Sequence, residues 1–145
     1  MNRNSTRYKS NQQEKRLAKG IGGRQVVGSG STPFLKGDVV TANLFIEAKT
    51  KAQASKSITV KKEWLEKAQE QSYSMRKRDY ALAISFGDGK DYYVIEDKLM
   101  EELYKSRAAL EAVIEVLGGL EDNLVDDLDG LTGNGIRRLI RRYVD

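Results

Sequence analysis

A predicted β-hairpin over residues 36–49 limits what this chain can fold into more than any other stretch. Two short apolar segments joined by a turn carry Asp38 at the start of the first strand and Glu47 and Lys49 in the second. Side chains alternate between the faces of a strand, so Glu47 and Lys49 share one face while Ala48 points to the other. The hairpin returns Asp38 close to Glu47. The pattern predicts two carboxylates and a lysine at a sheet edge, where they can hold a hard divalent cation.

The composition narrows the chemistry that such a site can perform. The 145 residues include no cysteine and no histidine. Disulfides, thiolate or histidine metal sites and a Ser-His catalytic pair are therefore excluded, and hydrolysis would depend on carboxylates, lysine, tyrosine and metal-bound water. The length suits one main domain with one core. No apolar run approaches the length of a membrane span and no leader peptide is recognisable, so we expect no membrane partner.

The charge is distributed unequally along the chain. Residues 1–78 hold 17 Lys and Arg against 6 Asp and Glu, whereas residues 79–145 hold 8 against 15. A basic half that also carries the acidic hairpin favours a polyanionic partner such as a nucleic acid. Lysines that only solvate helices would produce the same composition. The salt dependence of DNA binding separates the two interpretations, because phosphate contacts weaken steeply with salt.

The order of the acidic and basic residues resembles the D…(D/E)-x-K signature of the PD-(D/E)XK nuclease superfamily. Asp38 is followed after eight residues by Glu47-Ala48-Lys49, and Glu14 lies upstream in a helix-like stretch, ahead of a loop rich in glycine and serine at 28–31. Over residues 7–96 this order is similar to the Holliday junction resolvase branch and its phage-type relatives. The resemblance implies an α/β (α+β) fold with a restriction-endonuclease-like core, in which helices flank a mixed central β-sheet, and a short helical C-terminal tail.

The same resemblance implies roles for the candidate site residues. Asp38 and Glu47, with the backbone carbonyl of Ala48, would bind Mg²⁺, and Mn²⁺ would substitute for it. Lys49 would orient or deprotonate the attacking water, or stabilise the developing charge. Glu14 would be an outer ligand or a partner that holds Lys49. The implied activity is metal-dependent endonucleolytic cleavage of DNA, on branched substrates, in recombination, repair or DNA processing. A resolvase also implies a homodimer, because one active site cuts one strand, and the cytoplasm of a bacterial or phage-infected cell.

Several side chains outside this group are candidates for contacts with DNA. They are Ser29, Lys51, Arg76, Lys77, Arg78, Arg137, Arg138 and Arg141. Cationic and hydroxyl groups suit phosphate oxygens. A plain connecting loop around Ser29, and basic residues at 76–78 that only complement a helix dipole, are the structural alternatives.

Three other functions remain open. The chain could be another nuclease of the superfamily, such as an exonuclease or a nicking enzyme. It could be a non-catalytic DNA-binding module, although the intact Asp38, Glu47 and Lys49 argue against this. It could also be a protein-interaction factor that binds a partner through the acidic segment 120–129. Cleavage assays on branched and linear DNA distinguish among the first two, and DNA binding that does not depend on salt would favour the third.

The remaining pattern predicts the other elements and the domain limits. Residues 1–9 are expected to be a flexible basic arm and residues 10–117 the nuclease core domain. Within the core, the expected elements are helices at 10–19, 60–75 and 97–117 and strands at 25–27, 80–86 and 91–95. Trp64, in the second of these helices, is expected to be a core anchor.

The last expected helix, at 97–117, has a face of leucines, valine and isoleucine that we expect to join the core, and Gly118 and Gly119 are expected to end it. Residues 118–145 would then form an acidic linker and a basic C-terminal helix. That helix is either a plain amphipathic end helix or half of a helix-hairpin-helix motif, whose Gly-x-Gly amides would bind phosphate.

Overall fold

The structure of the chain is a computed structural model that describes residues 6–26 and 38–124. Its elements in order are α1 (Thr6–Ile21), β1 (Arg24–Gln25), β2 (Val39–Val40), β3 (Leu44–Thr50), α2 (Lys62–Ser74), β4 (Asp79–Ser85), β5 (Tyr92–Val94) and α3 (Asp97–Leu124). They divide into two compact units, Met1–Asp97 and Lys98–Asp145. Within the described ranges, no helix is long and apolar enough to span a membrane.

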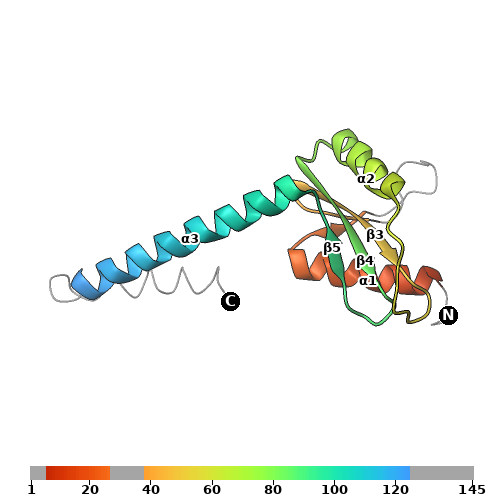
Figure 1. The fold of residues 1–145 in the computed structure, drawn as a ribbon, viewed down its shortest axis with the longest axis horizontal. Helices are drawn as coiled ribbons and strands as arrows, with labels where there is room; N and C mark the ends of the chain where they lie inside the picture. Colours follow the sequence, from red (N-terminus) through yellow and green to blue (C-terminus); the bar gives the residue numbers. More distant parts are fainter. Residues whose placement is uncertain (1–5, 27–37, 125–145) are drawn as a thin grey trace. The chain divides into compact units, whose positions relative to one another are not determined.

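The first unit is built on a five-stranded mixed sheet with the order β1-β2-β3-β4-β5. Neighbouring strands are antiparallel except for β3 and β4, which are parallel and are joined by a crossover that contains α2. A parallel pair requires such a long connection, whereas the antiparallel strands β2 and β3 need only a turn. Figure 1 shows α1 and α2 on either side of the strands. The predicted α+β fold, a mixed sheet flanked by helices, is confirmed.

Each face of the sheet has its own small core because the side chains of β3 alternate. Ile46 packs with Leu17 of α1 on one face, in a cluster that Ala48 also joins. Phe45 packs with Ala68 of α2 on the other face. Burying a leucine, isoleucine or phenylalanine side chain stabilises the fold by about 1.5–3 kcal/mol. The even-numbered residues of β3 therefore face α1, and the odd-numbered ones face α2. The hairpin pattern predicts this alternation but not which helix covers each face.

The start of α1 differs from the prediction. The helix begins at Thr6, so residues 6–9 are helical and do not belong to a flexible arm. Tyr8 and Lys9 are partly buried, and this packing extends the helix beyond the Ser10 or Asn11 cap that local sequence suggests. Residues 1–5 lie outside the described part of the chain.

The end of α3 also differs from the prediction. The helix passes through Gly118 and Gly119 and ends at Leu124, so the expected break and the first part of the expected acidic linker are wrong. Each interior glycine costs about 1 kcal/mol relative to alanine, which a helix of this length can tolerate. The expected core face is wrong as well, because Leu103, Leu110 and Val113 are more than half exposed. The predictions for residues 125–145 lie outside the described residues.

Candidate active site

The length of β2 places Asp38 opposite Glu47. β2 contains only Val39 and Val40, which pair with Ile46 and Phe45 of β3, while β3 itself continues to Thr50. Asp38 therefore lies one residue beyond the paired segment, and its Oδ1 accepts a hydrogen bond from the backbone N–H of Ala48 at 3.1 Å. Asp38 and Glu47 are only 3% and 5% exposed. The hairpin thus brings two carboxylates together in a buried position at the end of a strand pairing.

Lys49 lies beside Glu47, two residues further along the same face of β3. Its Nζ donates a hydrogen bond to Oε1 of Glu47 at 2.6 Å. The ammonium also lies 5.3 Å from the centre of the Trp64 ring, which comes from the first turn of α2. Trp64 is half-buried rather than a core anchor. No sequence signal links it to the hairpin, because only the crossover between β3 and β4 brings α2 over this face.

Glu14 approaches the same place from α1. Its carboxylate accepts a hydrogen bond from Nε2 of Gln25 in β1 at 3.0 Å. Burial raises the pKa of Glu14, and the negative charge of Glu47 adds to this, while the bond from Gln25 opposes it. The fold therefore places Glu14 near enough for its charge to act on Asp38 and Glu47, and we call Glu14, Asp38, Glu47 and Lys49 the carboxylate site.

The carboxylate of Asp38 has the most perturbed environment of this group. Burial raises its pKa to about 9, and the charge of Glu47 and a hydrogen bond with Glu47 act in the same direction. The N–H of Ala48 opposes the shift, and Glu14 adds a small further rise. Two buried acids that face each other cannot both ionise at little cost. The ionised form of Asp38 is therefore disfavoured beside Glu47 unless a cation is present.

The donors present fit a small divalent cation. In the described part of the chain, no three acidic side chains are close enough to hold one ion between them. Mg²⁺ normally uses only one or two carboxylates and keeps several waters, so Asp38 and Glu47 meet its needs. The N–H and C=O groups of one strand residue point to the same side, so the carbonyl of Ala48 also faces Asp38. Burial and the charge of Glu47 raise the pKa of Asp38, and a cation here would offset both effects.

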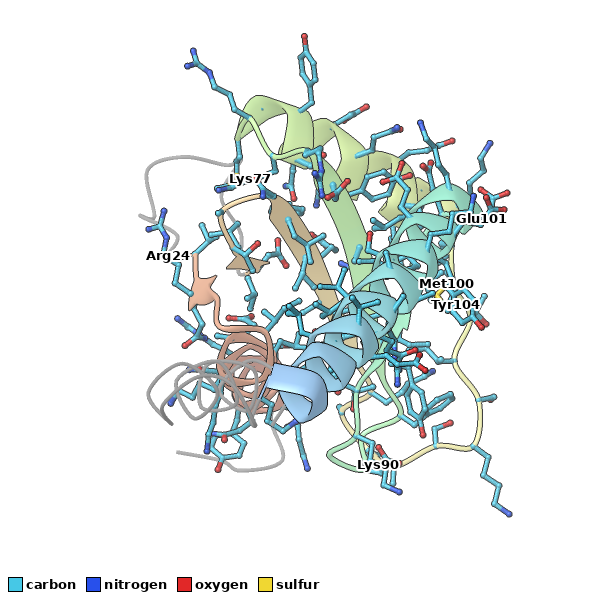
Figure 2. The ribbon with its side chains drawn as sticks, turned by 90° about the vertical axis from the view of Figure 1, so that its left-hand side faces the viewer. Arg24, Lys77, Lys90, Met100, Glu101 and Tyr104 are labelled. Carbon is cyan, nitrogen blue, oxygen red and sulfur yellow. The ribbon has the colours of Figure 1, made fainter. Side chains whose placement is uncertain are left out.

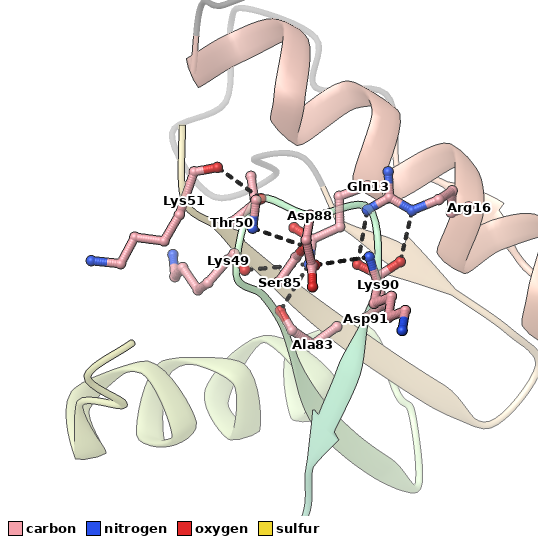
Figure 3. A network of polar contacts seen from close by, with 11 residues as sticks. Gln13, Arg16, Lys49, Thr50, Lys51, Ala83, Ser85, Asp88, Lys90 and Asp91 are labelled. Carbon is pink, nitrogen blue, oxygen red and sulfur yellow. Dashed lines mark hydrogen bonds and ion pairs between the residues drawn. The ribbon is translucent and has the colours of Figure 1, made fainter. Parts of the chain in front are cut away.

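Gln13 anchors α1 to the two central strands. Its side chain is fully buried, and its Nε2 donates to the backbone carbonyls of Lys49 and Ala83, both at 3.3 Å. Figure 3 shows Gln13 reaching from α1 to the ends of β3 and β4. Its Oε1 is buried and has no hydrogen-bond partner among the described residues. Because Glu14 is the next residue, Gln13 positions the carboxylate that α1 contributes. Sequence reasoning missed it, since one glutamine in a polar helix carries no signal.

The predicted DNA contacts fall in different places. Lys51 is exposed and lies two residues beyond Lys49, next to the carboxylate site in the chain. Arg76 is exposed just after α2, with a positive φ of 54°. The remaining candidates outside the described residues are Ser29, Arg137, Arg138 and Arg141.

Lys77 and Arg78 already have partners within the fold. Nζ of Lys77 donates to the carbonyls of Thr41 and Ala42 in the β2–β3 turn, at 2.7 and 3.2 Å, and Figure 2 labels this lysine beside the hairpin. Nε of Arg78 pairs with Asp79 at 2.9 Å. These two residues lie at the turn end of the hairpin, whereas the carboxylate site is at its open end. Their contact with DNA remains a prediction.

A separate pocket of about 200 Å³ lies on the α1 face of the sheet. Lys9, Arg16 and Ser85 are among the residues that line it. Arg16 makes a two-pronged ion pair with Asp91, with distances of 2.9 and 3.0 Å (Figure 3). The pocket does not include the carboxylate site, and the pair holds α1 against the start of β5.

No family model, no curated protein and no solved structure matches the chain.

Proposed function

We propose that the chain is a metal-dependent endodeoxyribonuclease of the PD-(D/E)XK type that acts on branched DNA. The observation that supports this most is the buried pair of Asp38 and Glu47, with Ala48 bonded to one acid and Lys49 bonded to the other. A structural ion pair would need one carboxylate for one lysine. Here a second buried acid raises the electrostatic cost of burying these charged groups. A bound cation would offset that cost.

Each residue of the carboxylate site has a role in this proposal. Asp38 and Glu47, with the Ala48 carbonyl, would hold Mg²⁺, and the bound ion would supply positive charge that stabilises the transition state of phosphodiester hydrolysis. Lys49 presents its ammonium to the reacting phosphate, in a position set by Glu47 and the Trp64 ring. Such preorganised charge is most effective where water is partly excluded, and the Lys49 side chain is only 29% exposed.

The preference for DNA follows from charge, and the preference for branches follows from the resemblance. The basic half of the chain carries the site, and Lys51 lies exposed next to it. Lys51 is therefore the described residue best placed to contact a phosphate near the scissile bond. Cutting both strands of a junction requires two sites, which supports the expected homodimer.

The test is cleavage of a labelled four-way junction and a matched linear duplex in Mg²⁺ and in EDTA. The variants are Glu47→Gln and Lys49→Ala. The control is Glu66→Gln, an exposed carboxylate of α2 that pairs with Lys62. We expect wild type and the control to cut the junction in Mg²⁺ only. The two site variants should lose at least about 100-fold in rate and still bind the junction.

Each alternative function predicts a different result. A junction that is bound but never cut by any divalent metal would replace the nuclease with a non-catalytic DNA-binding module. Equal cutting of junction and duplex would indicate another nuclease of the same superfamily. DNA binding that is absent, or independent of salt, would leave the protein-interaction factor with the acidic segment 120–129.

A further inference from the structure

α3 carries a seven-residue repeat of leucine. Leu103, Leu110 and Leu117 are each seven residues apart, and Leu124, the last residue of the helix, is the next in the series. A second series falls between them, at 99, 106, 113 and 120, and only Ser106 in it is polar. Apolar residues spaced alternately by three and four form a narrow stripe along a helix, which is the pattern of a coiled-coil seam.

The stripe is exposed from Leu103 to Val113. Every residue from Met100 to Val113 is exposed, with Leu103 at 54%, Leu110 at 53% and Val113 at 54%. Met100 and Tyr104, which flank the stripe and are labelled in Figure 2, are also exposed, at 56% and 69%. A helix of 28 residues is about 42 Å long. Helices in water depend mainly on packing of an apolar face, so this one requires a partner.

We propose that α3 forms a parallel, in-register two-stranded coiled coil with α3 of a second copy of this chain. A repeat of 3.5 residues packs best against a helix with the same repeat, and a second copy provides one. Gly118 and Gly119 follow Leu117 directly and lie outside both leucine-rich series. They therefore leave the seam uninterrupted.

Charges beside the seam select the parallel register. Glu102 immediately precedes the seam residue Leu103, and Arg107 follows the seam residue Ser106. In a parallel pair these positions face each other across the seam, so Glu102 lies near Arg107 of the partner subunit. Symmetry produces this opposite-charge pair twice. Within one helix, Arg107 also pairs with the exposed Glu111 at 2.9 Å, so its guanidinium already lies along the helix surface.

This inference does not rest on the nuclease proposal, since it uses only α3. Light scattering after size-exclusion chromatography measures the mass of the full chain directly. We expect twice the 16.3 kDa of one chain for wild type. Leu103→Glu combined with Leu110→Glu should reduce the mass to that of one chain. Ala108→Glu combined with Ala112→Glu adds the same charge away from the seam and should remain dimeric.

Circular dichroism of all variants checks that α3 and the sheet remain folded. A wild-type mass of one chain, or of three or more chains, would overturn the proposal. So would a seam variant that stays dimeric. If both glutamate pairs dissociate the dimer, charge alone accounts for the effect and the seam is not the interface.

The register has its own test because the chain has no cysteine. Ser106→Cys places one thiol on the seam, where two parallel, in-register helices bring the thiols together. We expect a disulfide-linked dimer on mild oxidation, and its absence would overturn the parallel register. Glu102→Arg should weaken the dimer roughly tenfold, and adding Arg107→Glu should restore it, because the pair is then reversed rather than lost.

Discussion

The backbone N–H of Ala48 donates a hydrogen bond to Oδ1 of Asp38 over 3.1 Å, and this bond joins the acid before β2 to the centre of β3. Because the donor is a backbone N–H group, substitution of the neighbouring residues Glu47 or Lys49 does not remove this hydrogen bond. Asparagine at position 38 would keep an oxygen acceptor while removing the charge. The chemistry of the two carboxylates can therefore be changed without moving the strands that carry them.

The stability of the metal-free protein should fall as pH rises, because of Asp38. Its pKa is raised from 3.8 to about 9 by burial and by Glu47. The folded chain thus binds this proton more tightly than the unfolded chain. The stabilisation is complete below about pH 4 and is lost as the pH rises through about 9. In EDTA at pH 8, Asp38→Asn should melt roughly 5 °C above wild type, by calorimetry.

Two controls belong to the pH experiment. Asp88→Asn changes an exposed turn carboxylate that accepts a bond from the N–H of Lys90, and it should keep the wild-type pH slope. Saturating Mg²⁺ should stabilise wild type more at pH 8 than at pH 5, since the cation requires ionised carboxylates, and should not stabilise Asp38→Asn. Equal pH slopes for wild type and Asp38→Asn would contradict the assignment of the raised pKa.

Lys49 should affect cleavage through its charge and its position. Lys49→Arg keeps the charge but not the compact ammonium that Glu47 holds at 2.6 Å, so we expect roughly a tenth of the wild-type rate. Trp64→Leu removes the ring at 5.3 Å and should slow cleavage roughly threefold to fivefold. Single-turnover rates on the bound junction measure both. Lys51→Ala is the control, because it should weaken binding while leaving this rate unchanged.

Gln13 should be important for stability and Gln12 should not. Gln13→Ala removes the bonds to the carbonyls of Lys49 and Ala83 and leaves a cavity under α1. The expected cost is about 2–3 kcal/mol in the free energy of unfolding. Gln12→Ala, at the partly exposed neighbour, should stay within about 0.5 kcal/mol. Urea denaturation measures both changes. Equal losses would mean that Gln13 does not hold α1 to the sheet.

Gly87 and Gly89 form a matched pair for testing a backbone contact. Both have positive φ, 84° and 86°, so alanine is strained to a similar extent at either position. A Cβ at Gly87 would lie 2.7 Å from the carbonyl oxygen of Gln53, whereas at Gly89 it meets nothing within 4 Å. Gly87→Ala should therefore cost about 1–3 kcal/mol more than Gly89→Ala in thermal or urea unfolding. Indistinguishable variants would show that the loop after β3 moves freely.

Local patterns were enough to predict the hairpin and the Asp38, Glu47 and Lys49 part of the carboxylate site, whereas Glu14 was assigned to the site through the family resemblance. Strand alternation places Glu47 and Lys49 on one face and Ala48 on the other, and the turn is short enough to return Asp38 to Glu47. These features depend on residues close together in the chain, so the sequence contains what is needed to infer them.

Features that depend on distant residues could not be inferred in this way. The bonds of Gln13 join residues 36 and 70 positions apart, and the approach of Trp64 to Lys49 depends on the crossover through α2. The limits of α3 were wrong for a related reason. Glycine propensity predicted an end at Gly118, but propensity is a weak guide where other forces extend a helix.

The span of the Gln13 bonds also affects how the protein is made. All four residues of the carboxylate site are synthesised by residue 49, but the Ala83 carbonyl that fixes α1, and the parallel partner of β3, come later. Parallel pairing closes a long loop and is slow to form. A chain that is still bound to the ribosome therefore contains the acidic residues before the folded site that they form has been assembled. We expect a nascent chain to gain metal affinity only when β4 has emerged and folded against β3.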